Sequence, residues 1–133
     1  MQRGRFNGKH VLITGGARGI GLDIAIRFAE EGAILSILDF NADTLGKAVR
    51  QLQELTATYG YHTDVSVREQ VDGAIDAADK VQPVDILINN AGIAAETPFL
   101  KIEETEWKRI IDINLTGMFY VAQAVCRVMA KRR

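Results

Sequence analysis

The sequence predicts an α/β fold that is built on a parallel β-sheet. Short apolar runs alternate along its 133 residues with segments in which apolar residues recur at helical spacing. A glycine or a helix-capping residue stands between most of these segments. Strands that alternate with helices pair in parallel, because each helix carries the chain back to the edge where the next strand begins.

Four apolar runs are expected to form the strands. The first is His10–Thr14, and the second covers residues 34–38 and is closed by Asp39. The third, residues 58–63, is weaker because a glycine lies inside it, whereas the fourth, residues 84–88, is strongly apolar. Right-handed crossovers between four such strands give the spatial order 3-2-1-4. A ligand is then expected between strands 1 and 4, at the carboxyl ends of the strands.

The segments between these runs carry helix signals. The first helix follows the glycines after strand 1 and ends at Gly32, and Asn41 is expected to cap the second. Ser66 and Glu69 have the spacing of a capping box at the start of the third helix, which Pro83 ends.

The last predicted helix runs from Glu103 to about residue 130. Asn114 and Gly117 interrupt its pattern, so we expect a bend or break there. Its apolar residues exceed what one face of a sheet would cover, and strand 4 would leave a hydrophobic sheet edge. We therefore expect further chain or a second subunit to cover these surfaces.

Composition and charge exclude several classes. The chain has 47% hydrophobic and 25% charged residues, which fits a globular domain. Its net charge of −1 creates no overall positive potential that would attract nucleic acid or an anionic membrane. The one cysteine, Cys126, precludes an intrachain disulfide, and its apolar neighbours predict that it is buried. The first ten residues lack the apolar stretch of a signal peptide, and no segment has the length of a membrane span. We expect one cytoplasmic domain over residues 1–133, without a metal site.

A glycine-rich segment, residues 14–21 (TGGARGIG), joins the first strand to the first helix. Gly15 lets the chain turn out of the strand, Gly19 removes a side chain where a pyrophosphate approaches, and Gly21 lets the helix pack closely. The amides and the dipole at the helix start favour phosphate groups. A glycine-rich turn without a ligand is the alternative, and no Gly-Lys-Ser/Thr closes the run as in a P-loop. In this strand–turn–helix context the segment predicts the dinucleotide site of a Rossmann-type doubly wound sheet.

Asp39 follows Gly21 by 18 residues, close to the spacing of about 20 expected for an acid that anchors the adenosine ribose. Its carboxylate would accept hydrogen bonds from the ribose hydroxyls and repel a 2′-phosphate, which favours NAD over NADP. Arg18 argues the other way, because a basic residue beside Gly19 could meet that phosphate. Phe40, however, stands where an NADP site would want an arginine. A surface acid that precedes a helix is the alternative interpretation of Asp39.

Two further polar segments follow the third and fourth strands. Asp64 could receive the adenine amino group with Val65 against the ring, or it could belong to the turn before the next helix. The segment Asn89-Asn90-Ala91-Gly92 offers small residues and amides that suit a wall of a cofactor cleft. As a bare tetrapeptide it would be an ordinary turn.

Taken in order, these segments resemble the short-chain dehydrogenase/reductase family over essentially the whole chain. The resemblance implies an NAD-dependent oxidoreductase that transfers a hydride between the nicotinamide and a secondary alcohol or ketone. It implies a cofactor site with a pyrophosphate turn, a ribose anchor, an adenine site and a lining amide. By this resemblance the ribose anchor is Asp39, the adenine site is Asp64 with Val65, and the lining amide is Asn90. The pyrophosphate turn consists of Gly15, Arg18, Gly19, Ile20 and Gly21. Asn114 resembles the family's catalytic asparagine, whose freed backbone carbonyl holds a water of a proton relay.

The family's chemistry also needs a serine and a Tyr-x-x-x-Lys after Asn114. None of Tyr59, Tyr61 and Tyr120 has a lysine four residues later. We therefore expect the chain as given to be truncated before the catalytic segment, and to bind a dinucleotide without transferring a hydride. The intact enzyme is expected to be a homo-oligomer that associates through the last helix. The alternatives are an inactive nucleotide-binding or interaction module and a methyltransferase. Residues 89–92 and Asn114 argue against the methyltransferase.

Overall fold

The computed structural model describes residues 4–132 and contains a four-stranded parallel sheet in the order β3-β2-β1-β4. Residues 1–3 of the polar N-terminal segment and Arg133 lie outside the described range. The strand order confirms the predicted doubly wound arrangement. The strands are β1 (His10–Thr14), β2 (Ile34–Asp39), β3 (Thr58–His62) and β4 (Ile86–Ile88).

β4 is shorter than the apolar run that predicted it. The run begins at Val84, but the backbone N–H of Val84 donates to Asp79 Oδ1 at 2.9 Å. The strand begins two residues later and pairs with β1 from Val11 opposite Ile86 to Ile13 opposite Ile88. β4 forms one edge of the sheet, and its three residues are half-buried.

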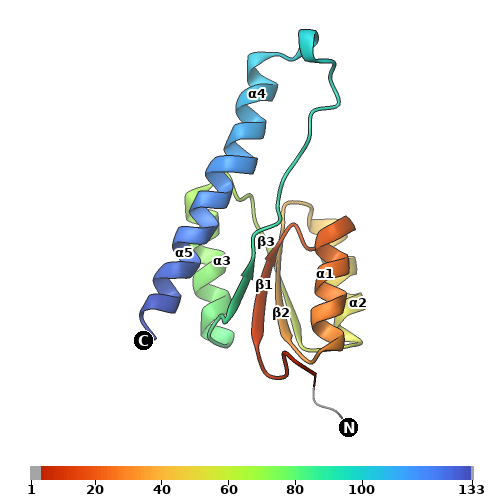
Figure 1. Cartoon of the computed structure of the whole chain (residues 1–133), viewed down its shortest axis with the longest axis vertical. Coiled ribbons are helices and arrows are strands. Elements are labelled where there is room, and N and C mark those ends of the chain that lie inside the picture. Colours follow the sequence, from red (N-terminus) through yellow and green to blue (C-terminus); the bar gives the residue numbers. More distant parts are fainter. Residues whose placement is uncertain (1–3, 133) are drawn as a thin grey trace.

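Helices cover both faces of the sheet (Figure 1). α1 (Gly19–Glu30) and α2 (Ala42–Gln53) lie on one face, and α3 (Arg68–Val81) and α5 (Met118–Ala130) lie on the other. α4 (Glu104–Ile111) extends beyond the sheet, and a short 3₁₀ turn, η1 (Phe99–Lys101), precedes it. In the described part of the chain, no helix combines the length and the apolar character that a membrane crossing requires.

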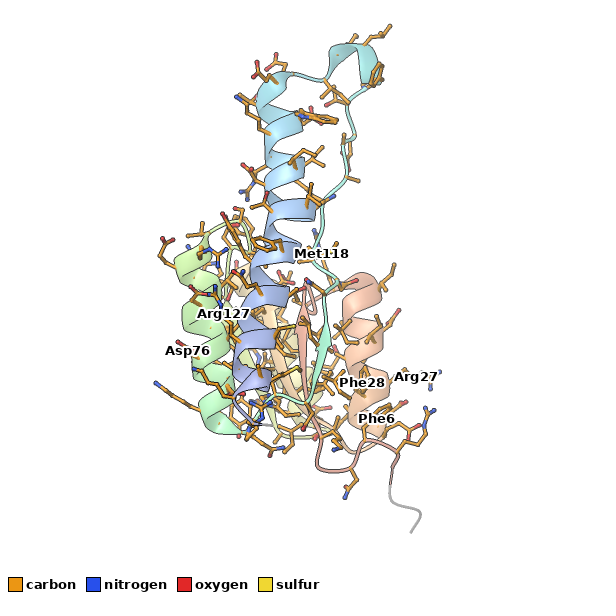
Figure 2. All side chains as sticks on the ribbon, turned by 60° about the vertical axis from the view of Figure 1, so that its left-hand side comes forward. Phe6, Arg27, Phe28, Asp76, Met118 and Arg127 are labelled. Atoms are coloured by element: carbon orange, nitrogen blue, oxygen red, sulfur yellow. The ribbon has the colours of Figure 1, made fainter. Side chains whose placement is uncertain are left out.

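β1 is buried along its whole length and separates two apolar cores. Val11 and Ile13 pack toward α1 and α2, whereas Leu12 packs toward α3 and α5, because successive side chains of a strand point to opposite faces. A strand buried on both faces reads as a continuous apolar run, as it does here. The N-terminal segment joins the first core where the Phe6 ring meets Phe28 edge-on, with 4.7 Å between the ring centroids (Figure 2).

One predicted cap is present and one is wrong. Asn41 Oδ1 accepts from the N–H groups of residues 43 and 44 at the start of α2, as expected. The predicted capping box of Ser66 and Glu69 does not form, because α3 begins at Arg68 and Ser66 Oγ donates to Asp64 Oδ1 at 2.6 Å. Val67, and not Ser66, stands directly before the helix, so the Ser66 side chain lies one residue too early to cap it and remains in the turn.

The predicted long C-terminal helix is interrupted where expected. A π-helical stretch, η2 (Asp112–Gly117), joins α4 to α5 and contains Asn114. The prediction that Cys126 is buried is wrong. Cys126 is exposed, because it lies on the side of α5 opposite the residues that pack into the second core.

Candidate functional site

The glycine turn leaves β1 at the carboxyl edge of the sheet. Gly15 and Gly19 have φ angles of +63° and +53°, a region that side-chain-bearing residues rarely adopt. A Cβ at Gly21 would lie 2.2 Å from the carbonyl oxygen of Gly15, so this position admits no side chain. A Cβ at Gly19 would meet no atom within 4 Å. The turn therefore combines a close contact on its inner side with open space beside Gly19.

α1 begins without a capping side chain among the described residues. Arg18 precedes the helix in an extended conformation, and the first turn of the helix contains no acidic residue. The first N–H to bond back along the chain is that of Leu22, which donates to the Arg18 carbonyl at 3.2 Å. The amides of residues 19–21 have no acceptor within the helix and lie at the positive end of its dipole. An anionic group fits this position, and the exposed side chains of Arg18 and Ile20 border it.

Asp39 is fixed beside this turn by two backbone amides. Its Oδ2 accepts from Ala17 N at 3.1 Å, and its Oδ1 accepts from Asn41 N at 3.0 Å. Each carboxylate oxygen can accept a further hydrogen bond, and the residue is only partly buried. The structure thus brings the predicted ribose anchor to the predicted phosphate turn, with its charge held in one orientation.

Asn90 joins the ends of β1 and β4. Its side-chain Nδ2 donates to the carbonyl oxygens of Thr14 and Gly15, both at 3.1 Å. Thr14 Oγ1 in turn accepts from the backbone N–H groups of Asn90 and Ala91, both at 3.0 Å. Thr14 opens the predicted glycine-rich segment, but no role was predicted for its side chain, although the predicted order 3-2-1-4 places strands 1 and 4 next to each other. These four hydrogen bonds join the ends of β1 and β4, where the strand order reverses, and they hold Asn90 against the glycine turn.

Asp64 lies beyond the end of β3 in a polar cluster. Its Oδ1 accepts from Ser66 N at 3.0 Å and from Ser66 Oγ, and its Oδ2 faces both terminal nitrogens of Arg109 at 3.4 Å. Burial raises the pKa of Asp64, but the Ser66 hydrogen bonds and the charge of Arg109 lower that pKa to below its ordinary value. The carboxylate is therefore ionised at neutral pH. Arg109 was not predicted as part of the site.

Val65, the predicted partner of the adenine ring, is largely buried. It is 8% exposed, and a Cβ at Gly117 would lie 2.7 Å from its Cγ2. Close packing between Val65 and the π-helical stretch explains why position 117 is a glycine.

Asn114 is held by the segment that follows β4. Its Oδ1 accepts from Ile93 N at 2.8 Å, and its Nδ2 donates to Ile93 O at 2.7 Å. Asn89 Nδ2 donates to the carbonyl oxygen of Met118, just after the π-helical stretch, at 2.9 Å. A π-helical turn often marks a functional site, because it leaves backbone groups without their usual helical partners. The helix break and the segment after β4 are therefore tied together at the carboxyl edge.

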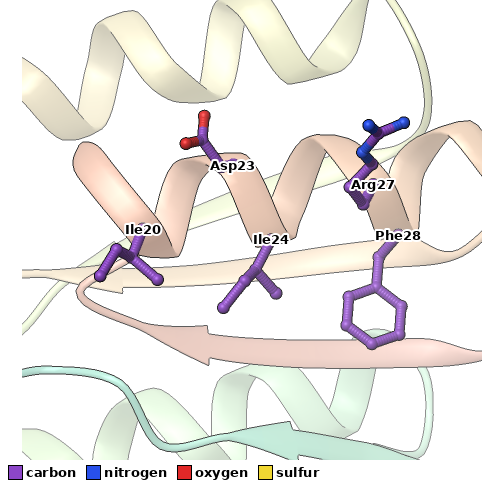
Figure 3. Close-up of a pocket in the computed structure, with 5 residues that line it drawn as sticks. All are labelled: Ile20, Asp23, Ile24, Arg27 and Phe28. Carbon is purple, nitrogen blue, oxygen red and sulfur yellow. The ribbon is translucent and has the colours of Figure 1, made fainter.

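An apolar hollow lies apart from these groups, along α1. Ile20, Ile24 and Phe28 point into it, with Asp23 and Arg27 beside them (Figure 3). It shares only Ile20 with the residues predicted for the site.

The chain is similar to known proteins along nearly its whole length. Residues 9–133 match the family profile described as short chain dehydrogenase. The 5-keto-D-gluconate 5-reductase of Escherichia coli (strain K12) is 38% identical over 128 residues, which cover 95% of this chain and 50% of that protein. The galactitol 2-dehydrogenase (L-tagatose-forming) of Cereibacter sphaeroides is 35% identical over 128 residues, covering 96% of this chain and 50% of that protein.

Solved structures share the fold. An NAD⁺-bound xylitol dehydrogenase superposes with a TM-score of 0.91 at 37% identity, covering 96% of this chain and 50% of that one. The L-sorbose reductase of Gluconobacter frateurii in complex with NADPH and L-sorbose superposes with a TM-score of 0.87 at 30% identity, covering 99% of this chain and 51% of that one. The chain spans about half the length of the curated relatives described above. By its profile match, its sequence identity and its fold, the chain belongs to the short-chain dehydrogenase/reductase family.

Proposed function

We propose that this chain binds NAD at the carboxyl edge of its sheet. In this proposal it is the cofactor-binding part of an oxidoreductase that interconverts a secondary alcohol and its ketone. The observation that carries the proposal is the juxtaposition of the uncapped start of α1, the open space at Gly19 and the fixed carboxylate of Asp39. An anionic pyrophosphate fits the helix start and the open space at Gly19, and the two hydroxyls of a ribose fit the carboxylate of Asp39. When bound, the nicotinamide supplies the hydride acceptor or donor.

NAD rather than NADP is proposed because of Asp39. A fixed carboxylate accepts from both ribose hydroxyls but repels a phosphate on the 2′ oxygen. The related structures include an NAD⁺ complex and an NADPH complex, so the family alone does not decide the cofactor. Asp39 is held by the amides of Ala17 and Asn41, and it cannot turn away from a 2′-phosphate without losing both hydrogen bonds.

The remaining predicted residues take supporting roles in the proposal. Asn90 keeps the glycine turn against β4 through two hydrogen bonds. Both of these hydrogen bonds come from its Nδ2, so they do not use its Oδ1. Asn114 uses its side chain to hold Ile93, so the proposed catalytic contribution comes from its backbone carbonyl in the π-helical stretch. That carbonyl would hold a water molecule for proton transfer.

We further propose that the whole enzyme is a homo-oligomer that associates through α4 and α5. Four large apolar side chains are exposed along these two helices and the π-helical stretch between them: Trp107 in α4, Leu115 in η2, and Met118 and Phe119 in α5. Large apolar side chains gathered along one pair of helices favour contact with another apolar surface.

Calorimetric titration of the folded chain tests the binding proposal. We expect heat with NAD, weaker binding of NADP, and no binding of a methyl donor such as S-adenosylmethionine. A folded sample that gives no heat with any adenine dinucleotide would overturn the proposal, and preferential binding of the methyl donor would favour a methyltransferase instead.

A second measurement addresses catalysis. The sequence contains no Tyr-x-x-x-Lys, so we expect the chain to bind NAD without reducing it in the presence of a broad panel of secondary alcohols. The alternative function, an inactive nucleotide-binding module, predicts the same result for this chain. The two differ for the full coding sequence. Continuation into a Tyr-x-x-x-Lys together with reduction of NAD supports the enzyme, and a protein that binds NAD but never reduces it supports the module.

A further inference from the structure

Arg109 reaches from α4 to the carboxyl ends of two strands. One guanidinium nitrogen lies 3.2 Å from Ser66 Oγ, and both terminal nitrogens lie 3.4 Å from Asp64 Oδ2, beyond the end of β3. The guanidinium carbon also lies 5.6 Å from the ring centroid of Phe40, which directly follows Asp39 at the end of β2. α4 otherwise extends past the sheet (Figure 1), so Arg109 ties this helix to the rim of the proposed dinucleotide site.

Within this cluster, Asp64 can accept further hydrogen bonds but cannot donate one. Ser66 occupies Oδ1 with two donors, and the ion pair with Arg109 orients Oδ2. An ionised carboxylate accepts hydrogen bonds and donates none. The Asp64 side chain is 17% exposed, so part of it stays reachable from the surface. A ligand group that meets Asp64 must therefore be a donor.

This capacity distinguishes purine bases by one substituent. Adenine carries an exocyclic amino group, which donates, whereas hypoxanthine carries a carbonyl oxygen at the same position, which only accepts. A carbonyl oxygen placed against an ionised carboxylate makes no hydrogen bond and meets like partial charge. The choice between the two bases thus depends on Asp64 staying ionised and oriented, and Arg109 contributes to both.

We propose that Arg109 is a positioning residue that makes the base end of the site selective for a purine with an exocyclic amino group. The inference rests on the proposed function, because it assumes that the adenosine half of a dinucleotide lies over the ends of β2 and β3. Arg109 itself acts through Asp64. Its contact with the Phe40 ring keeps the guanidinium beside the carboxylate instead of in solvent.

The test compares two dinucleotides that differ only in that substituent. The affinities of NAD and nicotinamide hypoxanthine dinucleotide are measured by calorimetry for the full 133-residue chain. We expect the native chain to prefer NAD by about tenfold or more, as for the loss of a hydrogen bond to a charged group. In Arg109→Met, the preference for NAD should fall to between about onefold and threefold. Arg109→Lys should retain an intermediate preference, because it keeps the charge but not the contact through two nitrogens.

A matched control lies next to Arg109. Lys108 belongs to the same helix and pairs with Glu104 at 3.0 Å, away from Asp64. Lys108→Met removes the same charge and should keep the native ratio. Melting temperatures of all variants are recorded, so that a purely structural effect, which lowers both affinities equally, is distinguished from a change in the ratio.

Each outcome decides the proposal. A ratio that falls in Arg109→Met and is retained in Lys108→Met supports it. A native ratio near one, an unchanged ratio in Arg109→Met, or an equal loss of both affinities in Arg109→Met and Arg109→Lys overturns it. Failure of the native chain to bind either dinucleotide overturns the proposed function instead.

Discussion

Removing the carboxylate of Asp39 is the most direct test of how the site chooses its cofactor. In Asp39→Ala, the proposed ribose site loses an acceptor that is held in place by the amides of Ala17 and Asn41. A hydrogen bond to a charged group is worth about 1.5–3 kcal/mol, so the dissociation constant for NAD should rise by about ten- to a hundredfold. The repulsion toward a 2′-phosphate disappears with the charge, so the preference for NAD over NADP should narrow by at least about tenfold.

The same substitution has a separate cost in stability. Ala17 is 5% exposed, and its N–H loses its acceptor when the carboxylate is removed. A buried donor left without a partner costs about 1–3 kcal/mol, so the melting temperature of Asp39→Ala should also fall. Affinities are therefore compared by calorimetry well below the transition of the variant.

Asp43 offers a control with the same change in charge. It is exposed in the first turn of α2, and Asp43→Ala should cost only about 0.3–1 kcal/mol through the helix dipole. We expect its affinities for NAD and NADP to match those of the native chain. If Asp39→Ala binds both dinucleotides as tightly as the native chain does, Asp39 is not part of the site and does not select the cofactor.

Three further predictions concern packing, local opening and pH. Gly21→Ala should lower the melting temperature and abolish NAD binding, because a Cβ there would collide with the glycine turn. In Gly73→Ala in α3 the new Cβ meets no atom within 4 Å, so this variant should stabilise the chain by about 0.4–1 kcal/mol. Equal melting temperatures for the two variants would contradict this. Asn114→Ala removes the acceptor of the Ile93 N–H, so hydrogen exchange at that amide should accelerate, and an unchanged rate would show that the side chain does not hold the segment. The lowered pKa of Asp64 contributes stability that is present above its ordinary pKa of 3.8 and is lost as the pH falls through the lower value of the folded state. The difference in denaturant midpoint between the native chain and Asp64→Asn should therefore shrink on acidification, and a constant difference would argue against an ionised Asp64 in the folded chain.

The order of the sheet could be predicted from the sequence because each strand carries its own signal. β1 and β2 are buried on both faces, so their apolar runs are continuous and their position in the centre of the sheet follows. The glycine turn was equally predictable, because the conformations of Gly15 and Gly19 and the contact at Gly21 require glycine locally.

The features that were missed depend on neighbours distant in the sequence or on competition between groups. Arg109 meets Asp64 across 45 positions, and nothing in the pattern of α4 indicates which strand ends its side chains reach. The capping signal of Ser66 failed because the helix begins one residue later than the signal indicates, with Val67 at the cap position, and the Ser66 hydroxyl donates to Asp64 instead. The burial of Cys126 was mispredicted because almost the whole run from Val121 to Met129 is apolar, so the sequence does not show which side of the helix meets the sheet.

The central place of β1 has a consequence for how the chain is made. Of the four strands, β1 is synthesised first, and one of its edges pairs with β2, the next strand in the chain. The other edge pairs with β4, which directly follows Asp85, the residue that accepts from His10 N across 75 positions. At ribosomal rates of about 5–20 residues per second, that edge stays open for roughly 4 to 15 seconds. An apolar strand edge left open in this way can pair with the wrong strand. The topology that places the glycine turn in the middle of the sheet thus also makes the nascent chain depend on timely synthesis of the fourth strand, or on a chaperone that covers the open edge until then.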